Sequence, residues 1–258
     1  MADVHESISG RAGRRLLAPA LVIVAAATIG FAEPAPPATS GPLLSQALAG
    51  PWKGTESLVF CTRSPYSDGH WYANIGYYCD DENQKAYAGN GKPDDGKLCL
   101  LDLRTSAVKV LLDANGGSVR DPQVSYDGRR VLFSHRPAGT DFYHLYEIGA
   151  DGSGLRRITD GPFDDYEPIY LPDDDIVFVS TRCKRWVNCW MTQVGTLYRC
   201  GPDGGRIESI SPNTEHDNTP WLLPDGRLLY TRWEYVDRSQ VEYHGLWTMN
   251  PDGTDAAV

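Results

Sequence analysis

The residue types most capable of chemistry in this chain gather between positions 180 and 200, in the stretch STRCKRWVNCWMTQVGTLYRC. It carries three cysteines, whose thiolates are strong ligands for zinc. Structural zinc sites usually bring their cysteines in C-x(2–4)-C pairs, whereas five and ten residues separate the three cysteines here. The spacing therefore favours disulfide bonds over a metal centre, and we predict no metal site.

Disulfide bonds need an oxidising compartment, and the N-terminus indicates export to one. Arg11, Arg14 and Arg15 precede an apolar run that ends at Ala32. A basic region, a short apolar segment and a small-residue exit are typical of a cleaved export signal, here residues 1–32. An uncleaved anchor is the alternative, because the 17 residues of the run lie at the lower limit of a membrane span. We predict a periplasmic or otherwise exported protein, membrane-anchored only if the signal is not cleaved.

All six cysteines follow this signal, and an even number in an exported chain indicates a disulfide framework. Six cysteines allow fifteen connectivities, so the pairing stays open. The disulfide candidates are Cys61, Cys79, Cys99, Cys183, Cys189 and Cys200.

The charge balance excludes one class of partner. Of the 24 basic and 34 acidic residues, three and two lie within residues 1–32, which leaves 21 against 32 in the remainder. Nucleic-acid binding requires a positive surface to neutralise phosphates. We therefore expect no nucleic-acid partner.

The scaffold that positions these residues is read from an internal repeat. Three segments align without gaps in their pattern: DPQVSYDGRRVLFSHR (121–136), EPIYLPDDDIVFVSTR (167–182) and TPWLLPDGRLLYTRW (219–233). Each holds a proline, a short apolar strand, a turn with aspartate, a second apolar strand and an arginine. Each is followed by a further strand and an Asp-Gly pair, which favours tight hairpins because glycine tolerates positive φ. Four strands per unit, with turn aspartates 46 and 52 residues apart, predict the blades of a β-propeller.

We predict an all-β fold, a propeller of four-stranded antiparallel blades that follows a proline-rich linker at residues 33–54. The fourth blade stops where its outermost strand should begin, and propellers close into rings. The propeller region, residues 55–258, is therefore expected to be the N-terminal part of a larger propeller. The predicted blades span approximately 57–112, 121–159, 167–211 and 219–258.

The repeats resemble the TolB-type, WD40-like propeller repeat, most closely at YDGRRVLFSHR and LPDGRLLYTR. Longer phrases outside the repeat pattern, such as HWYANIGYYC and EHDNTPWLLPDGRLLYTRWEYVDRSQV, resemble proteins related to the hydrazine synthase alpha subunit of planctomycete bacteria. The resemblance runs from about residue 57 to residue 258, and it implies an N-terminal propeller followed by haem-bearing regions. Haem c attachment needs C-x-x-C-H, which this chain lacks. We therefore expect no cofactor in this chain, and haem c only in a region downstream of it.

Charged residues recur beside the repeat prolines and at the ends of the second strands. Because these positions lie near the central channel of a propeller, we expect a polar ring, used either to bind a ligand or to join blades through salt bridges. A histidine beside an aspartate can be a general base, but no nucleophile accompanies it, and G-x-S-x-G and H-E-x-x-H are both absent. No catalytic residue is predicted. The candidates for this ring are Asp121, Arg136, Asp165, Glu167, Arg182, His216, Asp217 and Arg232.

Two insertions, one at residues 64–97 and one after Arg182, are rich in aromatic and basic residues that either dock a partner or pack on one another. We predict an exported scaffold or binding module whose partner is a protein or the chain's own C-terminal region. The alternative is a gating propeller in a larger redox or hydrolytic enzyme with its catalytic residues beyond residue 258. An accessory protein like that of the Tol–Pal system is a third possibility. The docking candidates are Trp71, Tyr72, Lys184, Arg185, Trp186 and Trp190.

Overall fold

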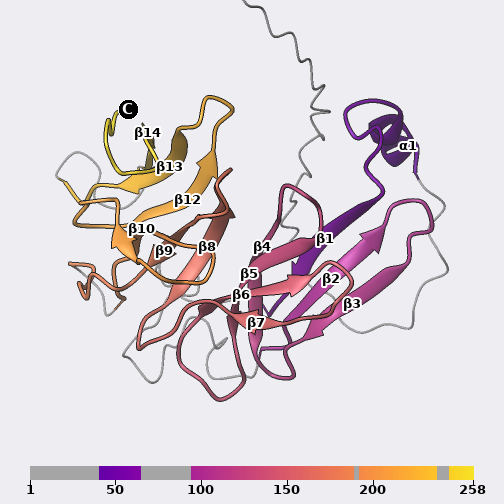
Figure 1. Ribbon diagram of the computed structural model, residues 1–258, viewed down its shortest axis with the longest axis horizontal. Helices are drawn as coiled ribbons and strands as arrows, with labels where there is room; N and C mark the ends of the chain where they lie inside the picture. The colour runs from indigo at the N-terminus through magenta and orange to yellow at the C-terminus, as the bar shows by residue number, and fades with distance from the viewer. Residues whose placement is uncertain (1–40, 65–93, 189–191, 237–243) are drawn as a thin grey trace, which may run out of the picture.

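The computed structural model describes residues 41–64, 94–188, 192–236 and 244–258. Within them the chain forms four antiparallel sheets, and each sheet contacts the next one along the chain (Figure 1). In every sheet, hydrogen-bonded neighbours are consecutive strands. The predicted all-β class is confirmed, and the sheets are called blades 1 to 4 below.

The strands of each blade are short, mostly five to seven residues. Blade 1 comprises β1 (Ser57–Thr62), β2 (Lys97–Asp102) and β3 (Val108–Asp113). Blade 2 comprises β4 (Ser118–Val124), β5 (Arg130–Arg136), β6 (His144–Gly149) and β7 (Arg156–Arg157). Blade 3 comprises β8 (Asp165–Tyr170), β9 (Ile176–Ser180), β10 (Thr196–Cys200) and β11 (Glu208–Ser209). Blade 4 comprises β12 (Asp217–Leu222), β13 (Leu228–Trp233) and β14 (His244–Met249).

The turns between the first and second strands of a blade follow the predicted chemistry. Gly128 and Gly226 have φ values of 73° and 91°, and each donates its N–H back to the end of the preceding strand segment, at Ser125 and Leu223. Blade 3 has Asp174 at this place, with φ 67°. Aspartate is one of the few side chains that tolerate this backbone region, so the turn forms without glycine.

Blades 1 and 4 differ from the four-stranded pattern of blades 2 and 3. The three strands of blade 1 correspond to the second, third and fourth strands of blade 2, and no described residue fills the innermost position. The strands of blade 4 correspond to the first three of blade 3. A single bridge between Thr248 and Ala257 stands where β11 pairs with β10 in blade 3.

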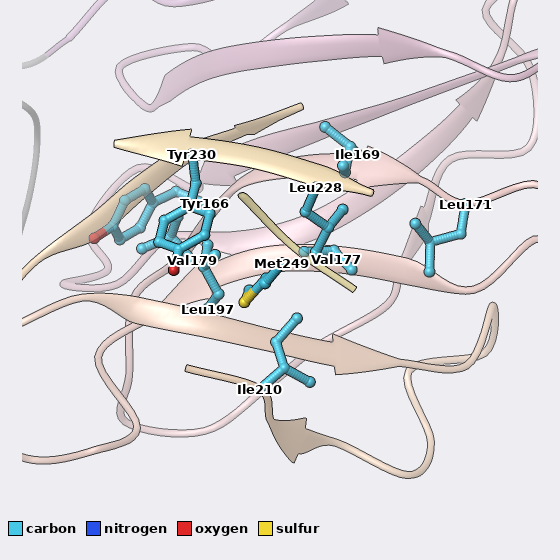
Figure 2. Close-up of a cluster of buried hydrophobic side chains, with 10 residues drawn as sticks. All are labelled: Tyr166, Ile169, Leu171, Val177, Val179, Leu197, Ile210, Leu228, Tyr230 and Met249. Atoms are coloured by element: carbon cyan, nitrogen blue, oxygen red, sulfur yellow. The ribbon is translucent and has the colours of Figure 1, made fainter. Parts of the chain in front are cut away.

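The hydrophobic core lies between blades rather than within them. Both faces of a middle blade are covered, which is why all five residues of β9 are buried and apolar except for the terminal Ser180. Figure 2 shows the layer between blades 3 and 4, in which Val177 and Val179 of β9 lie in the same cluster as Leu228 and Tyr230 of β13. Similar clusters fill the junctions of blades 1 with 2 and 2 with 3.

The two rims of the blades carry different loops. In each blade the start of the first strand lies beside the end of the second strand, at one rim. In blade 3 Asp165 pairs with Ser180, and in blade 4 Asp217 pairs with Arg232. The long insertions after β1 and β9 leave from this rim, called the loop rim below. The short aspartate turns lie at the opposite rim.

The segment predicted as a linker contains one short helix, α1 (Pro42–Ala49). Its proline lies in the first turn, where the missing N–H costs no hydrogen bond, and none of its residues is buried. No helix among the described residues is long and apolar enough to cross a membrane. The predicted signal, residues 1–32, lies outside the described residues.

No disulfide joins any two of the four cysteines that the structure describes. Cys61 and Cys99 lie on adjacent strands but face Leu98 and Phe60, so their side chains point to opposite sides of the sheet. The Cys183 thiol donates to the carbonyl of Val194 at 3.2 Å. The Cys200 thiol is buried, and this burial raises its pKa to about 12. The other two candidates, Cys79 and Cys189, lie outside the described residues, and pairing through them stays a prediction.

Candidate functional site

The innermost strands of blades 2, 3 and 4 share an unusual backbone feature at the residue before the repeat proline. Asp121, Glu167 and Thr219 have φ values of 56°, 49° and 55°, and the pairing of each strand with its neighbour shifts register there. The shift is a β-bulge, which places one extra residue in the strand and re-aims its backbone. A residue before proline normally stays extended, so three repeats of this conformation indicate a built feature.

The bulges form a hydrogen-bonded ladder from blade to blade. The backbone N–H of Glu167 donates to the Asp121 carboxylate at 3.1 Å, and that of Thr219 donates to the Glu167 carboxylate at 2.5 Å. The side chains of Asp121 and Glu167 thus each accept the backbone N–H of the bulge residue in the next blade. Arg120 lies beside the first step, 2.6 Å from Asp121 and 3.3 Å from Glu167. We call Arg120, Asp121, Glu167 and Thr219 the bulge ladder.

The bulge ladder holds two acids and one buried cation. The side chains of Arg120 and Glu167 are 5% and 15% exposed. Burial and the negative charge of Asp121 raise the pKa of Glu167 to about 7, against the positive charge of Arg120, which lowers it. The Arg120 guanidinium also lies over the ring of Tyr166, 5.3 Å from its centroid. The predicted polar ring therefore includes Asp121 and Glu167, and in this structure they join blades 2, 3 and 4.

The predicted aspartates nearer the loop rim pair within their own blades. Asp165 is fully buried, 2.8 Å from Arg182, and its other oxygen accepts from Ser180 at 2.6 Å. Asp217 is also fully buried and receives two parallel bonds from Arg232, both at 2.9 Å. These partners satisfy both oxygens of each buried carboxylate, which leaves little capacity for a ligand. The sequence predicted either a ligand-binding ring or salt bridges between blades. The arginine partners of these two aspartates lie in the same blade as each aspartate, while His144 of blade 2 lies 3.6 Å from Asp165 of blade 3.

His216 is not a residue of the rim surface. Its ring is fully buried, stacks on Trp233 with 5.7 Å between centroids, and accepts a hydrogen bond from the N–H of Gly195 at 3.0 Å. Burial and the neighbouring His244 lower its pKa to about 3. Gly195 is needed here because a Cβ would overlap the hydroxyl of Tyr166. The pairing of His216 with Asp217 in the sequence therefore does not create a solvent-accessible general base.

Arg136 is separate from the other predicted arginines. It is buried, donates to the carbonyl of Thr140 at 3.2 Å, and lies over the ring of Tyr143 at 5.9 Å. Its role in the structure is to hold the loop between β5 and β6. The four predicted acids fall into two groups: Asp121 and Glu167 lie in the bulge ladder, and Asp165 and Asp217 pair with arginines of their own blades.

The insertion between β9 and β10, residues 181–195, presents two of the predicted docking residues. The ring of Trp186 is 41% exposed and Lys184 is exposed beside it. Arg185 instead turns inward, donates to the carbonyl of Asn213 and is half-buried. Trp71, Tyr72 and Trp190 lie outside the described residues. Of this group, Lys184 and Trp186 are therefore the exposed side chains among the described residues.

Two polar residues near these sites were missed from the sequence. Arg120 directly precedes the Asp-Pro step, and only its contacts across 47 residues show its importance. Glu215 is 2% exposed, its Oε2 has no hydrogen-bond partner among the described residues, and burial raises its pKa to about 7 against the pull of Arg185. In the segment EHDNTP, the sequence pattern pointed to His216 and Asp217 and gave no signal for Glu215.

The opposite rim carries a shallow groove of about 390 Å³ between blades 3 and 4. Asp173, Arg199 and Asp252 contribute its charges, and Arg199 is already bound to Asp173 at 2.7 Å. No three His, Cys, Asp or Glu side chains come together as a metal site within the described ranges.

The comparisons with known proteins agree with the propeller that the repeat predicted. No family model matches the chain. Hydrazine synthase subunit alpha of Kuenenia stuttgartiensis is 29% identical over 81% of this chain and 31% of its own length. The chain resembles that subunit. The resemblance predicted from the sequence is thereby confirmed, and the chain spans about a third of the hydrazine synthase subunit.

Solved structures support the same fold. The hydrazine synthase of Kuenenia stuttgartiensis superposes with a TM-score of 0.61 at 20% identity, over 78% of this chain and 31% of that one. A putative TolB of Agrobacterium tumefaciens superposes with a TM-score of 0.50 at 19% identity, over 63% of this chain and 56% of its own. At these identities the likeness shows the fold, a β-propeller module, and the predicted propeller is confirmed.

Proposed function

We propose that this chain is an exported β-propeller module that binds a protein partner through the 181–195 loop at the loop rim. The observation that carries the proposal is the exposure of Trp186 on a loop that is fixed from beneath. Large aromatic and basic side chains supply most of the energy in protein interfaces. A large aromatic side chain that is 41% exposed, on a backbone paired with Gln193, is suited to that role.

The loop is held in place by its own backbone and by a small core. Trp186 pairs with Gln193, and the N–H of Val187 donates to the carbonyl of Thr192 at 2.9 Å. Val187 and Val194 are buried against Trp233 of β13. Because these contacts hold Val187 and Val194 against the blade, the backbone beside Trp186 has little conformational entropy left to lose when a partner docks.

The charges beside Trp186 indicate the chemistry of the partner. Lys184 lies over the ring of Phe163, 5.3 Å from its centroid, so its cation is fixed near the same surface. An exposed tryptophan next to a fixed cation suits a partner with an apolar pocket bordered by acidic residues. The chain as a whole is acidic, with a net charge of −10, and would repel such a partner elsewhere.

The proposal is tested by comparing tagged wild-type protein with Trp186→Ala in the source cells, by quantitative affinity purification. Leu155→Ala is the matched control, because Leu155 is also exposed, by 46%, in the turn before β7. We expect a specific partner to bind wild type and the control equally and Trp186→Ala about 30-fold more weakly, as truncating an interface hot spot costs about 2 kcal/mol. Equal recovery of every partner by all three proteins would contradict the proposal.

A second function is favoured by one finding, the match to 31% of a subunit named for hydrazine synthesis. In this alternative the propeller gates substrate access in a larger redox or hydrolytic enzyme, with haem c or the catalytic residues held outside this chain. Intact mass and the absorption spectrum of the native protein distinguish the two. A mass well above 28.5 kDa with a Soret band supports the enzyme, and a mass at or below that value without visible absorption refutes it.

A further inference from the structure

At the rim opposite the loop rim, called the turn rim below, a cation of one blade reaches the Asp-Gly turn of the next blade. The Lys109 ammonium of blade 1 donates to the carbonyl of Asp151 in blade 2 at 2.6 Å. The Arg156 guanidinium of blade 2 donates to the carbonyl of Pro202 in blade 3 at 3.0 Å. Both cations lie on the outermost strand of their blade, so the two junctions are joined by the same kind of contact.

The junction of blades 3 and 4 has an acid at the corresponding position. Arg156 pairs with Glu147, the fourth residue of β6, and Glu208 pairs with Arg199, the fourth residue of β10. Glu208 is exposed and therefore stands in blade 3 where Arg156 stands in blade 2. The Asp-Gly turn that follows in blade 4 supplies another acid, Asp252. Because a carboxylate cannot donate to a carbonyl, Glu208 does not make the contact that Arg156 makes.

The backbones of blades 3 and 4 nevertheless meet as closely as those of blades 2 and 3. Gly204 and Gly253 hold the same place in the Asp-Gly turns of blades 3 and 4. A Cβ on Gly204 would overlap the carbonyl oxygen of Ile158, and a Cβ on Gly253 would overlap that of Ile210. The two junctions are therefore equally tight at the turn, and they differ in their side chains.

The groove of about 390 Å³ lies at this junction, and both of its walls belong to described blades. Leu171 and Pro172 of blade 3 and Leu222 and Pro251 of blade 4 supply its apolar surface. Leu171 lies at one end of the buried layer between the two blades (Figure 2). The volume falls within the range of about 300–1,000 Å³ that is usual for ligand sites.

The charges at the groove leave it acidic. Asp173, Arg199 and Asp252 line it. Arg199 is held by two aspartates of its own blade, Asp173 at 2.7 Å and Asp175 at 2.8 Å, so its charge is already neutralised. Neither Asp252 nor Glu208, the cross-strand neighbour of Arg199, forms an ion pair within the described part of the chain. The groove therefore offers apolar walls and negative charge that a cation from outside can neutralise.

We propose that this groove binds a lysine or arginine side chain of a protein partner, carried on an apolar segment. The cation takes the place that Lys109 and Arg156 hold at the other two junctions, beside the turn carbonyl of Pro251 and the carboxylate of Asp252. The apolar residues next to it pack on the leucines and prolines of the groove walls. The site lies at the opposite rim from the 181–195 loop, so it does not depend on docking through that loop.

The first test is fluorescence polarisation with labelled tripeptides that carry lysine, arginine or glutamine between two leucines. We expect the lysine and arginine peptides to bind the protein about 10-fold more tightly than the glutamine peptide, because only they form charge-assisted hydrogen bonds. Glu208→Gln and Asp252→Asn should each weaken binding of the lysine peptide about 5-fold. Asparagine keeps an oxygen for the N–H of Thr254, so the turn is preserved. Asp203→Asn, at the equivalent turn position of blade 3, is the control and should bind as the wild type does.

Glu208→Arg gives the sharper test, because it restores the outer-strand cation. Its guanidinium should reach the carbonyl of Pro251 as Arg156 reaches that of Pro202, and so fill the site from within. We expect the lysine peptide to bind this variant at least about 20-fold more weakly, while the melting temperature is unchanged or higher.

The place of binding is checked by NMR, in which the lysine peptide should shift the methyl resonances of Leu171 and Leu222. Equal binding of the lysine and glutamine peptides overturns the proposal. So does binding that persists in Glu208→Arg, binding that shifts neither leucine, or no binding of any peptide up to about 10 mM.

Discussion

Removing Arg120 tests whether the bulge ladder holds the blades together. Arg120→Leu leaves the carboxylates of Asp121 and Glu167 facing each other without the guanidinium that lies 2.6 and 3.3 Å from them. Arg120 is only 5% exposed, and deleting one partner of a buried ion pair typically costs about 3–5 kcal/mol. We expect a loss of that size in the free energy of unfolding at pH 8.

The loss should shrink in acid. The pKa of Glu167 is raised to about 7 even with Arg120 present, and without the cation Glu167 is protonated still more readily. The two acids then no longer repel each other. At pH 5 we expect Arg120→Leu to cost about half as much as at pH 8, with the remainder due to lost packing over Tyr166.

The assay is urea unfolding followed by tryptophan fluorescence at both pH values. The control is Arg206→Leu, because Arg206 also contacts an aspartate, Asp175 at 3.3 Å, but its side chain is 74% exposed. Exposed pairs contribute about 0–1 kcal/mol. The double variant Arg120→Leu with Glu167→Gln should regain about 1–3 kcal/mol, since it removes the unpaired charge as well. Equal effects of Arg120→Leu and Arg206→Leu, or no dependence on pH, would refute the reasoning.

Three further predictions concern single residues. Glu167 and Glu215 both have a pKa raised to about 7 from 4.5, so each contributes stability that is full below pH 4.5 and is lost as the pH rises through 7. The melting temperature should therefore fall between pH 4.5 and pH 8, and it should fall less in Glu167→Gln and in Glu215→Gln than in the wild type. His216, whose pKa is lowered to about 3, should stay neutral from pH 8 to pH 5 in imidazole NMR spectra, and a midpoint near 6.5 would show that the ring is accessible. Thr219→Asn should raise the free energy of unfolding by about 0.5–1 kcal/mol, because asparagine tolerates the φ of 55° better than a β-branched residue; a loss of stability would show that the threonine hydroxyl already has a structural partner.

The sequence alone was sufficient for the features set by neighbouring residues. Alternating apolar positions and Asp-Gly turns determine strands and hairpins through local backbone preferences, so Gly128 and Gly226 mark turns that the structure contains. The period of the repeat predicted the blades, and the prolines marked the innermost strands. That these prolines each follow a bulge with positive φ was not predictable, because the residue before proline normally stays extended.

The tertiary structure decided which charges meet and which residues are accessible. Arg120 and Glu167 are 47 residues apart and meet only because consecutive blades pack at a fixed angle. His216 and Trp186 both looked like rim residues in the sequence, yet one is fully buried and the other is 41% exposed. Burial depends on what the neighbouring blade covers, and no local pattern records that. The same reason explains why Leu197 and Leu246, equivalent in the repeat, differ so widely in exposure: one has a following blade among the described residues and the other does not.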